Sequence, residues 1–176
     1  MPHDSATSQT TTNEEEYTFV ISRVFDAPRD LVFKAWSEVD HLKKWWGPKD
    51  FELSRVSLDF RPGGVFHYCM RSSEGFEMWG KFVYHEIDAP GKIVFVNSFS
   101  DPEGNIVRAP FSDSIPLEIR NVVTLSESEG RTTITLRSSP INATEEEISF
   151  FKGMFESMTQ GYGGTFDQLA EYLATI

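Results

Sequence analysis

The chain has 176 residues, of which 39% are hydrophobic and 14% aromatic, and 27 acidic against 16 basic side chains give a formal net charge of −11. This length favours a single domain with its own core, and the negative charge argues against nucleic acid or an anionic membrane surface as a partner. The chain lacks an apolar run of membrane-spanning length and a signal-peptide pattern, and its single cysteine cannot form an internal disulfide, so we expect a cytoplasmic protein.

The N-terminal residues 1–16 are mostly Ser, Thr, Asn and Glu. Because almost no apolar side chain can offset the entropy cost of ordering them, we predict a disordered tail. Residues 17–176 then form the single domain. Its first expected element is a strand from Tyr17 to Phe25, in which apolar residues alternate.

Two short helices are expected after this strand. The first opens at Pro28, because proline is tolerated in a first helical turn, and Asp30 interacts favourably with the positive end of the helix dipole. The second runs from about Val39 to Trp46 and ends at Gly47-Pro48, a common order of helix stop signals. Both helices therefore lie between the first and second strands.

The middle of the domain contains strand-like segments separated by turns rich in Gly, Pro, Asp and Ser. Short connections between consecutive strands favour an antiparallel meander. The longer connection 101–116, which contains three prolines, is expected to be a mobile loop at the rim of the sheet. The strand candidates are Phe51–Leu58, Val65–Arg71, Phe76–Ile87, Ile93–Phe99, and Leu117–Leu125 paired with Thr132–Arg137.

The C-terminal segment Ala143–Ile176 carries apolar and aromatic side chains at spacings of three and four residues. We predict one long amphipathic helix of about 45 Å, given the helical rise per residue. A small sheet must curl around such a helix, which leaves a hollow between them. The apolar stripe either packs as ordinary core or lines a cavity. Its interior glycines, which indicate bends or a close approach of backbone or ligand, are Gly153, Gly161, Gly163 and Gly164.

Alternation along the strands indicates which side chains face this helix. Asn97 is the polar member of the inward set, and a buried amide without partners would lose about 1–3 kcal/mol. It could orient a ligand or be tied to neighbouring backbone or water. Trp46 could likewise lie at a cavity mouth or fill the seam between helix and sheet. The candidate ligand-binding residues are Trp46, Phe66, Tyr68, Met70, Met78, Phe82, Phe95, Asn97, Phe99, Met154, Met158 and Tyr162.

Several strings of the sequence carry a family likeness by their order and spacing. They are Arg23–Pro28, Val32–Trp36, Leu42–Pro48, Arg61–Gly64, Phe66–Arg71, Phe99–Asp101 with Gly104-Asn105, and Gly161-Tyr162 leading to Leu169–Leu173. Together they resemble the heat-shock-protein-90 ATPase activator homologue-like family of the START-like, helix-grip superfamily. The resemblance implies an α+β helix-grip fold, START-like or Bet v-like: a curved antiparallel sheet around a long C-terminal helix, two short helices after the first strand, and a cavity between.

The resemblance implies less about activity, because fold alone does not decide function. Members of the superfamily bind lipids, hormones and polyketides, and a few are cyclases. The family is named for a co-chaperone whose additional N-terminal domain is important for engaging the chaperone. A tail of about 16 residues cannot replace that domain, which argues against chaperone activation.

Motifs that carry chemistry are few. The sequence has no G-x-S-x-G nucleophile elbow, no P-loop and no H-E-x-x-H pair. His67 and Cys69 share one strand face and could hold a metal, but the rest of a four-ligand set is not apparent, which favours an ordinary exposed pair. We therefore assign no catalytic residue, metal or cofactor.

Three hypotheses for the function follow. The first is a non-enzymatic module that binds a small, largely apolar, lipid- or polyketide-like molecule, with Asn97 and Tyr68 as polar anchors. The second is a cyclase or hydrolase in the same cavity, which needs a titratable group such as Tyr68, Tyr84 or Tyr162. The third is a chaperone-binding partner, which would use the outer surface and not the cavity.

Overall fold

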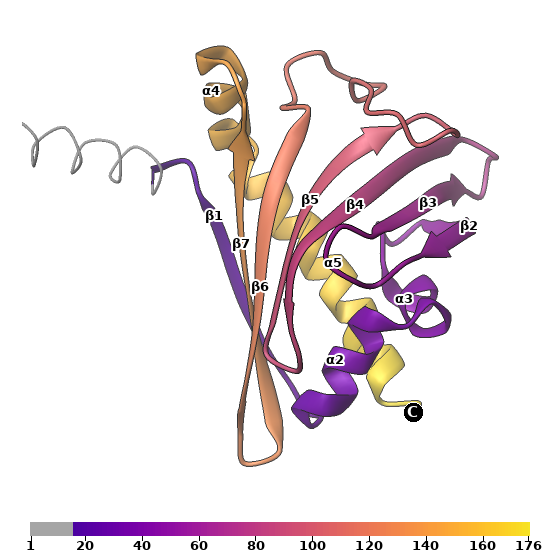
Figure 1. The fold of residues 1–176 in the computed structure, drawn as a ribbon, viewed down its shortest axis with the longest axis vertical. Coiled ribbons are helices and arrows are strands. Elements are labelled where there is room, and N and C mark those ends of the chain that lie inside the picture. The colour runs from indigo at the N-terminus through magenta and orange to yellow at the C-terminus, as the bar shows by residue number, and fades with distance from the viewer. Residues whose placement is uncertain (1–15) are drawn as a thin grey trace, which may run out of the picture.

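The structure, a computed structural model, describes residues 16–176 (Figure 1). The predicted disordered tail lies outside the described residues except for its last position. A seven-stranded antiparallel sheet in the order β1-β7-β6-β5-β4-β3-β2 forms one layer, and helices cover its concave face. The strands are β1 Phe19–Phe25, β2 Phe51–Leu58, β3 Val65–Ser72, β4 Glu77–Asp88, β5 Lys92–Ser100, β6 Glu118–Ser128 and β7 Arg131–Ile141.

The predicted antiparallel meander is confirmed, and the largest difference is at the end of β7. The sequence pattern ends this strand at Arg137, whereas β7 continues to Ile141. The added residues lack apolar alternation, yet Ser138 pairs with Phe19 of β1 and Asn121 of β6. Pairing with β1 at Ser138 and with β6 as far as Ile141 therefore extends β7 where its side chains give no strand signal.

The sheet curves around the C-terminal helix, as Figure 1 shows. Register shifts occur in β2 between Leu53 and Arg55 and in β4 between Tyr84 and Glu86. Such bulges bend the strand that carries them and increase its twist. Because the sheet is curved, it can contact one half of the C-terminal helix closely and leave a space beside the other half.

The C-terminal segment, predicted as one long helix with glycine bends over Ala143–Ile176, is interrupted once. It divides into α4 Glu145–Gly153 and α5 Phe155–Leu173, with Met154 at the junction. Gly153 is a poor helix former, and the break lets Phe151 of α4, which is fully buried, and the apolar stripe of α5 each follow the twisted sheet. The three glycines inside α5 do not interrupt it.

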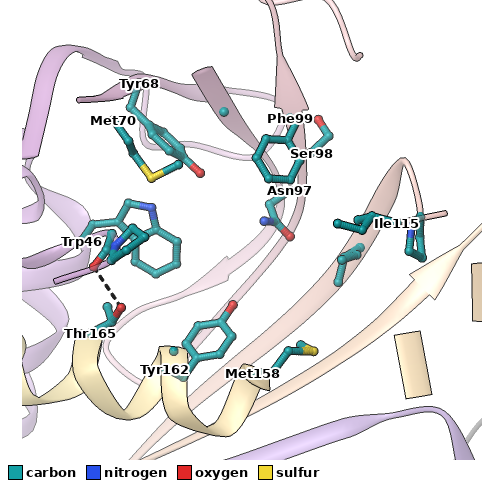
Figure 2. Close-up of a pocket in the computed structure, with 16 residues that line it drawn as sticks. Trp46, Tyr68, Met70, Asn97, Ser98, Phe99, Ile115, Met158, Tyr162 and Thr165 are labelled. Atoms are coloured by element: carbon teal, nitrogen blue, oxygen red, sulfur yellow. Dashed lines mark hydrogen bonds between the residues drawn. The ribbon is translucent and has the colours of Figure 1, made fainter. Parts of the chain in front are cut away.

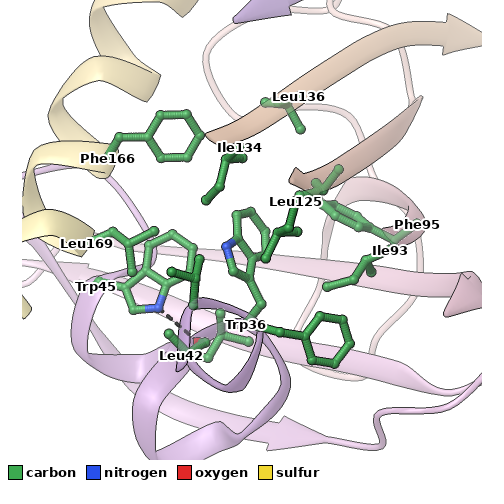
Figure 3. Close-up of a cluster of buried hydrophobic side chains, with 14 of the residues drawn as sticks. Trp36, Leu42, Trp45, Ile93, Phe95, Leu125, Ile134, Leu136, Phe166 and Leu169 are labelled. Atoms are coloured by element: carbon green, nitrogen blue, oxygen red, sulfur yellow. Dashed lines mark hydrogen bonds between the residues drawn. The ribbon is translucent and has the colours of Figure 1, made fainter. Parts of the chain in front are cut away.

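The two short helices, α2 Arg29–Ser37 and α3 Val39–Trp45, lie beside the C-terminal half of α5 (Figure 1). There the core is densely packed, as Figure 3 shows. The rings of Trp36 and Trp45 meet edge to face with centroids 4.8 Å apart, and the Trp45 indole N–H donates to the Ala35 carbonyl at 3.0 Å. Other fully buried members are Leu42, Ile134, Phe166 and Leu169. None of the helices over residues 16–176 has the length and apolarity of a membrane span.

Candidate ligand-binding cavity

The N-terminal half of α5 does not pack tightly on the sheet. A cavity of about 260 Å³ lies between them (Figure 2). Its walls come from α5, from the turn after α3, from β3 to β6, and from the end of the β5–β6 loop. Pro48 and Gly161, which line it, are exposed residues of the α3–β2 turn and of α5, so this part of the wall lies at the protein surface.

The structure brings part of the predicted set together around this cavity. The other residues of the lining are Ser98, Ile115, Ile119 and Thr165, together with Gly47, Pro48, Gly80, Pro116 and Gly161. The predicted residues that line the cavity are Trp46, Tyr68, Met70, Asn97, Phe99, Met158 and Tyr162.

The other predicted residues lie outside the lining. Phe66, Phe82 and Phe95 face inward but are fully buried in the core, where Phe82 and Phe95 stack with centroids 4.0 Å apart. Met78 packs half-buried against the edge of that core. Met154 occupies the α4–α5 junction, so the helix break removes it from the stripe that faces the cavity.

Two glycines shape the cavity in ways that the sequence pattern does not indicate. Gly80 of β4 faces the Tyr68 ring, and a Cβ at this position would lie 2.7 Å from the Tyr68 hydroxyl oxygen. Gly47, with φ at +107°, turns its carbonyl toward α5, where Thr165 donates to it at 3.0 Å and Gln168 at 2.9 Å (Figure 2). Gly80 therefore provides space for Tyr68, and Gly47 fixes the α3–β2 turn against α5.

Asn97 belongs to a polar network across three strands. Asn121 donates to the Asn97 Oδ1 atom at 2.8 Å and to the Ile119 carbonyl at 3.1 Å, and the Ser138 hydroxyl donates to the Asn121 Oδ1 atom. Asn121 and Ser138 are fully buried. Sequence reasoning missed both, because Asn121 is a small polar residue inside an otherwise ordinary strand and Ser138 lies beyond the predicted end of its strand. The alternatives for Asn97 are thus not exclusive: its oxygen is tied to a neighbour while its side chain lines the cavity.

The two ionisable side chains of the lining are tyrosines. Burial raises the pKa of Tyr68, opposed by a hydrogen bond from the Trp46 side chain. Burial likewise raises the pKa of Tyr162 to about 12, opposed by a hydrogen bond with Ser138. Both hydroxyls are therefore neutral at physiological pH. Tyr84, the third candidate acid, is buried in the core against Phe60 and is not part of the lining.

The loop 101–116 forms one wall of the cavity. Arg108 holds it together by donating to the carbonyls of Asp113 at 3.2 Å and Ile115 at 3.3 Å, and it pairs with Glu147 near the start of α4. Ile115 and Pro116 are buried and line the cavity. The mobility expected of this loop stays a prediction, but its position at the rim agrees with the structure.

Metal ligands do not cluster in the part of the chain that the structure describes. His67 is within 3.2 Å of the Ser100 hydroxyl and of the Asp101 carbonyl oxygen. Cys69 is fully buried, so the expectation of an exposed His67 and Cys69 pair is wrong for the cysteine. Its partners in the sheet are Arg55 of β2 and Trp79 of β4, and the Arg55 guanidinium lies 5.8 Å from the centre of the Trp79 ring.

Comparison with known proteins agrees with this architecture. The family described as Activator of Hsp90 ATPase homolog 1-like protein matches residues 26–174. The chain belongs to this family. No curated protein matches it in a sequence search.

Solved structures share the fold over nearly the whole chain. A protein from Arthrobacter aurescens has 27% identity and a TM-score of 0.76, with 92% of this chain and 88% of that one covered. A Mycobacterium smegmatis protein has 24% identity and a TM-score of 0.72, with 90% and 91% covered. A Nitrosomonas europaea protein has 23% identity and a TM-score of 0.72, with 91% and 96% covered. The family and its α+β fold are therefore established.

Proposed function

We propose that the protein binds a small, largely apolar, lipid- or polyketide-like molecule in the cavity between the sheet and α5. The observation that carries the proposal is the void beside Met158, in the N-terminal half of α5, where the apolar stripe could have packed as ordinary core. Its walls are mainly apolar with a few polar groups, the usual composition of small-molecule sites.

The size of the cavity limits the ligand. A cavity of about 150 Å³ is enough for benzene, and pockets for drug-sized molecules start at roughly 300 Å³. The 260 Å³ found between sheet and helix therefore suits a molecule of one or two rings, or a short acyl chain, better than a two-chain lipid. We place this function in the cytoplasm, where the single buried Cys69 would stay reduced.

The enzyme alternative would use the same cavity. A cyclase or hydrolase needs a group that moves a proton, and the lining offers the hydroxyls of Tyr68 and Tyr162, whose pKa values burial raises. These groups donate and accept hydrogen bonds at neutral pH but do not ionise. This chemistry favours binding over catalysis by the protein.

Family membership supports one other candidate, an interaction with the chaperone ATPase for which the family is named. Such an interaction would use the outer surface, so it is independent of the cavity. Binding of the full chain to the purified chaperone, measured by calorimetry, tests it separately. No detectable binding would remove this candidate and leave the cavity proposal untouched.

Methionine methyl NMR tests the ligand-binding proposal with internal controls. Met70 and Met158 line the cavity, whereas Met78 and Met154 do not. Titration with lipid-like and polyketide-like compounds is expected to shift the first pair and leave the second pair in place. If no compound shifts Met158, or if all four methyl signals move together, the proposal is wrong.

A further inference from the structure

The hydrogen bonds of Asn121 decide which way the Asn97 amide points. One end of the Asn121 side chain lies 3.1 Å from the Ile119 carbonyl oxygen, which can only accept, so that end is the NH2 group. The same group lies 2.8 Å from Asn97, so Asn97 must offer its oxygen there. The Asn97 NH2 group is therefore left for the cavity, which this side chain lines (Figure 2).

Tyr162 can serve as an acceptor. Its side chain lines the cavity, and Figure 2 shows its hydroxyl directed into it. A hydroxyl oxygen has two acceptor lone pairs besides its one proton, so it can accept a hydrogen bond from a molecule in the cavity.

The Tyr68 hydroxyl also ends in the cavity, as Figure 2 shows. Its one proton makes it a donor as well as an acceptor. The cavity therefore presents an amide donor from Asn97 and two hydroxyls, those of Tyr68 and Tyr162, that can donate or accept.

We propose that this cavity selects a neutral ring compound that carries a carbonyl oxygen next to an N–H donor, as in a lactam. The inference rests on the proposed function, because it names the ligand class of the same site. The carbonyl oxygen accepts from Asn97 and Tyr68, and the ligand N–H donates to Tyr162. Binding is non-covalent, and no proton changes its parent atom.

Both a charged ligand and a pure hydrocarbon are disfavoured. The described residues of the lining carry no formal charge, so a carboxylate would lose its hydration without gaining a cationic partner. A hydrocarbon would cover the Asn97 amide and the tyrosine hydroxyls without pairing them, which costs binding energy for each group. The lactam satisfies the same groups that the hydrocarbon leaves unpaired.

The test uses bicyclic probes of nearly equal size: dihydroisocarbostyril, a lactam; α-tetralone, its ketone analogue; tetralin, the hydrocarbon; and α-naphthoate, an anion. Affinities come from calorimetry on the full chain. We expect the lactam to bind about 5- to 10-fold more tightly than the ketone, and the ketone more tightly than tetralin by a similar factor. The anion is expected to bind more weakly than all three.

Single-residue variants show which side-chain group causes each difference in affinity. Asn97→Leu is expected to remove most of the difference between ketone and hydrocarbon, and Tyr162→Phe most of the difference between lactam and ketone. Tyr172→Phe is the matched control, because it removes a tyrosine hydroxyl that bonds His41 outside the cavity lining. It should leave the order of affinities unchanged. The wild-type ranking tests the inference even if a variant fails to fold.

The outcomes separate the two proposals. If tetralin binds as tightly as the lactam, the cavity is an apolar site without polar selection, and the inference fails while the proposed function stands. If the anion binds most tightly, the inference is also wrong. If none of the probes binds and no library compound shifts Met158, the proposed function itself fails.

Discussion

The two halves of α5 meet the same sheet in different ways. Around Phe166 and Leu169 the helix is pressed against β1, β7 and the tryptophans of α2 and α3 (Figure 3). Around Met158 and Tyr162 it faces a 260 Å³ cavity (Figure 2). A single helix with one continuous apolar stripe therefore borders a tightly packed core in one half and a cavity in the other.

The difference comes from what lies between helix and sheet. In the packed half, α2 and α3 insert large side chains, and Trp45 fills the space that the curved sheet leaves. Beside the N-terminal half of α5 no helix lies between α5 and the sheet. Trp46 and the Tyr68 ring form the wall of the cavity that faces the packed core. Similar apolar periodicity can thus serve stability in one half and binding in the other.

The largest expected effect is in the packed half. Leu169→Ala removes a fully buried side chain, and we expect a loss of about 3–5 kcal/mol in the free energy of unfolding, because a packed site cannot collapse around the void. Urea unfolding measures it. A loss under about 1 kcal/mol would show that the core around Leu169 is not tightly packed.

A smaller loss of stability is expected at Gly80, which leaves space for the Tyr68 ring in the cavity wall. A Cβ on Gly80 would lie 2.7 Å from the Tyr68 hydroxyl oxygen and 2.8 Å from its ring, so Gly80→Ala should push the ring into the cavity. We expect a loss of about 1–3 kcal/mol in stability and weaker binding of α-tetralone. Gly163→Ala is the control, because a Cβ there meets no atom within 4 Å. Equal behaviour of the two variants would contradict this role for Gly80.

The cavity half should tolerate truncation better than the packed half. Met158 already borders empty space, so Met158→Ala should cost less than about 2 kcal/mol, below the usual range for a packed methionine. Comparison of its urea unfolding with that of Leu169→Ala sharpens the contrast between the two halves. A loss near 5 kcal/mol would count against the cavity.

High pH should weaken the cavity half through Tyr162. Burial raises the pKa of Tyr162 from 10.0 to about 12, so the folded state holds this proton more tightly than the unfolded state. The stabilisation is complete below pH 10 and is lost as the pH rises through 12, with a slope of about 1.4 kcal/mol per pH unit. Tyr162→Phe should show a shallower decline in urea unfolding across this window. An unchanged slope would mean that Tyr162 ionises normally in the folded chain.

The smallest effect is expected at the loop that closes the cavity wall. Arg108→Met keeps the aliphatic stem but removes the pair with Glu147 and the bonds to the Asp113 and Ile115 carbonyls. We expect a loss of about 0.5–1 kcal/mol, since Arg108 is partly exposed, and faster amide exchange within the loop 101–116. Lys43→Met, which breaks an exposed pair with Asp40, should leave loop exchange unchanged. Equal exchange in both variants would show that Arg108 does not hold the wall.

The sequence by itself determined the family, the antiparallel order of the strands, the two short helices and the inward face of the central strands. These features depend on local patterns, such as alternation in Phe66, Tyr68 and Met70 or the Gly47-Pro48 stop signal. Such patterns depend only on residues that are close together in the sequence.

Only the tertiary structure decided which inward residues pack and which line a void. Phe82 and Met158 follow equally good periodic patterns, yet one is core and the other faces the cavity. The pattern offered four glycines as bends but did not say which of them interrupts the C-terminal helix, and it did not indicate the buried Asn121–Ser138 network. The physical reason is that a void, a helix break that follows sheet twist and a cross-strand hydrogen bond all depend on the distance between elements far apart in sequence, and hydrophobic periodicity carries no information on that distance.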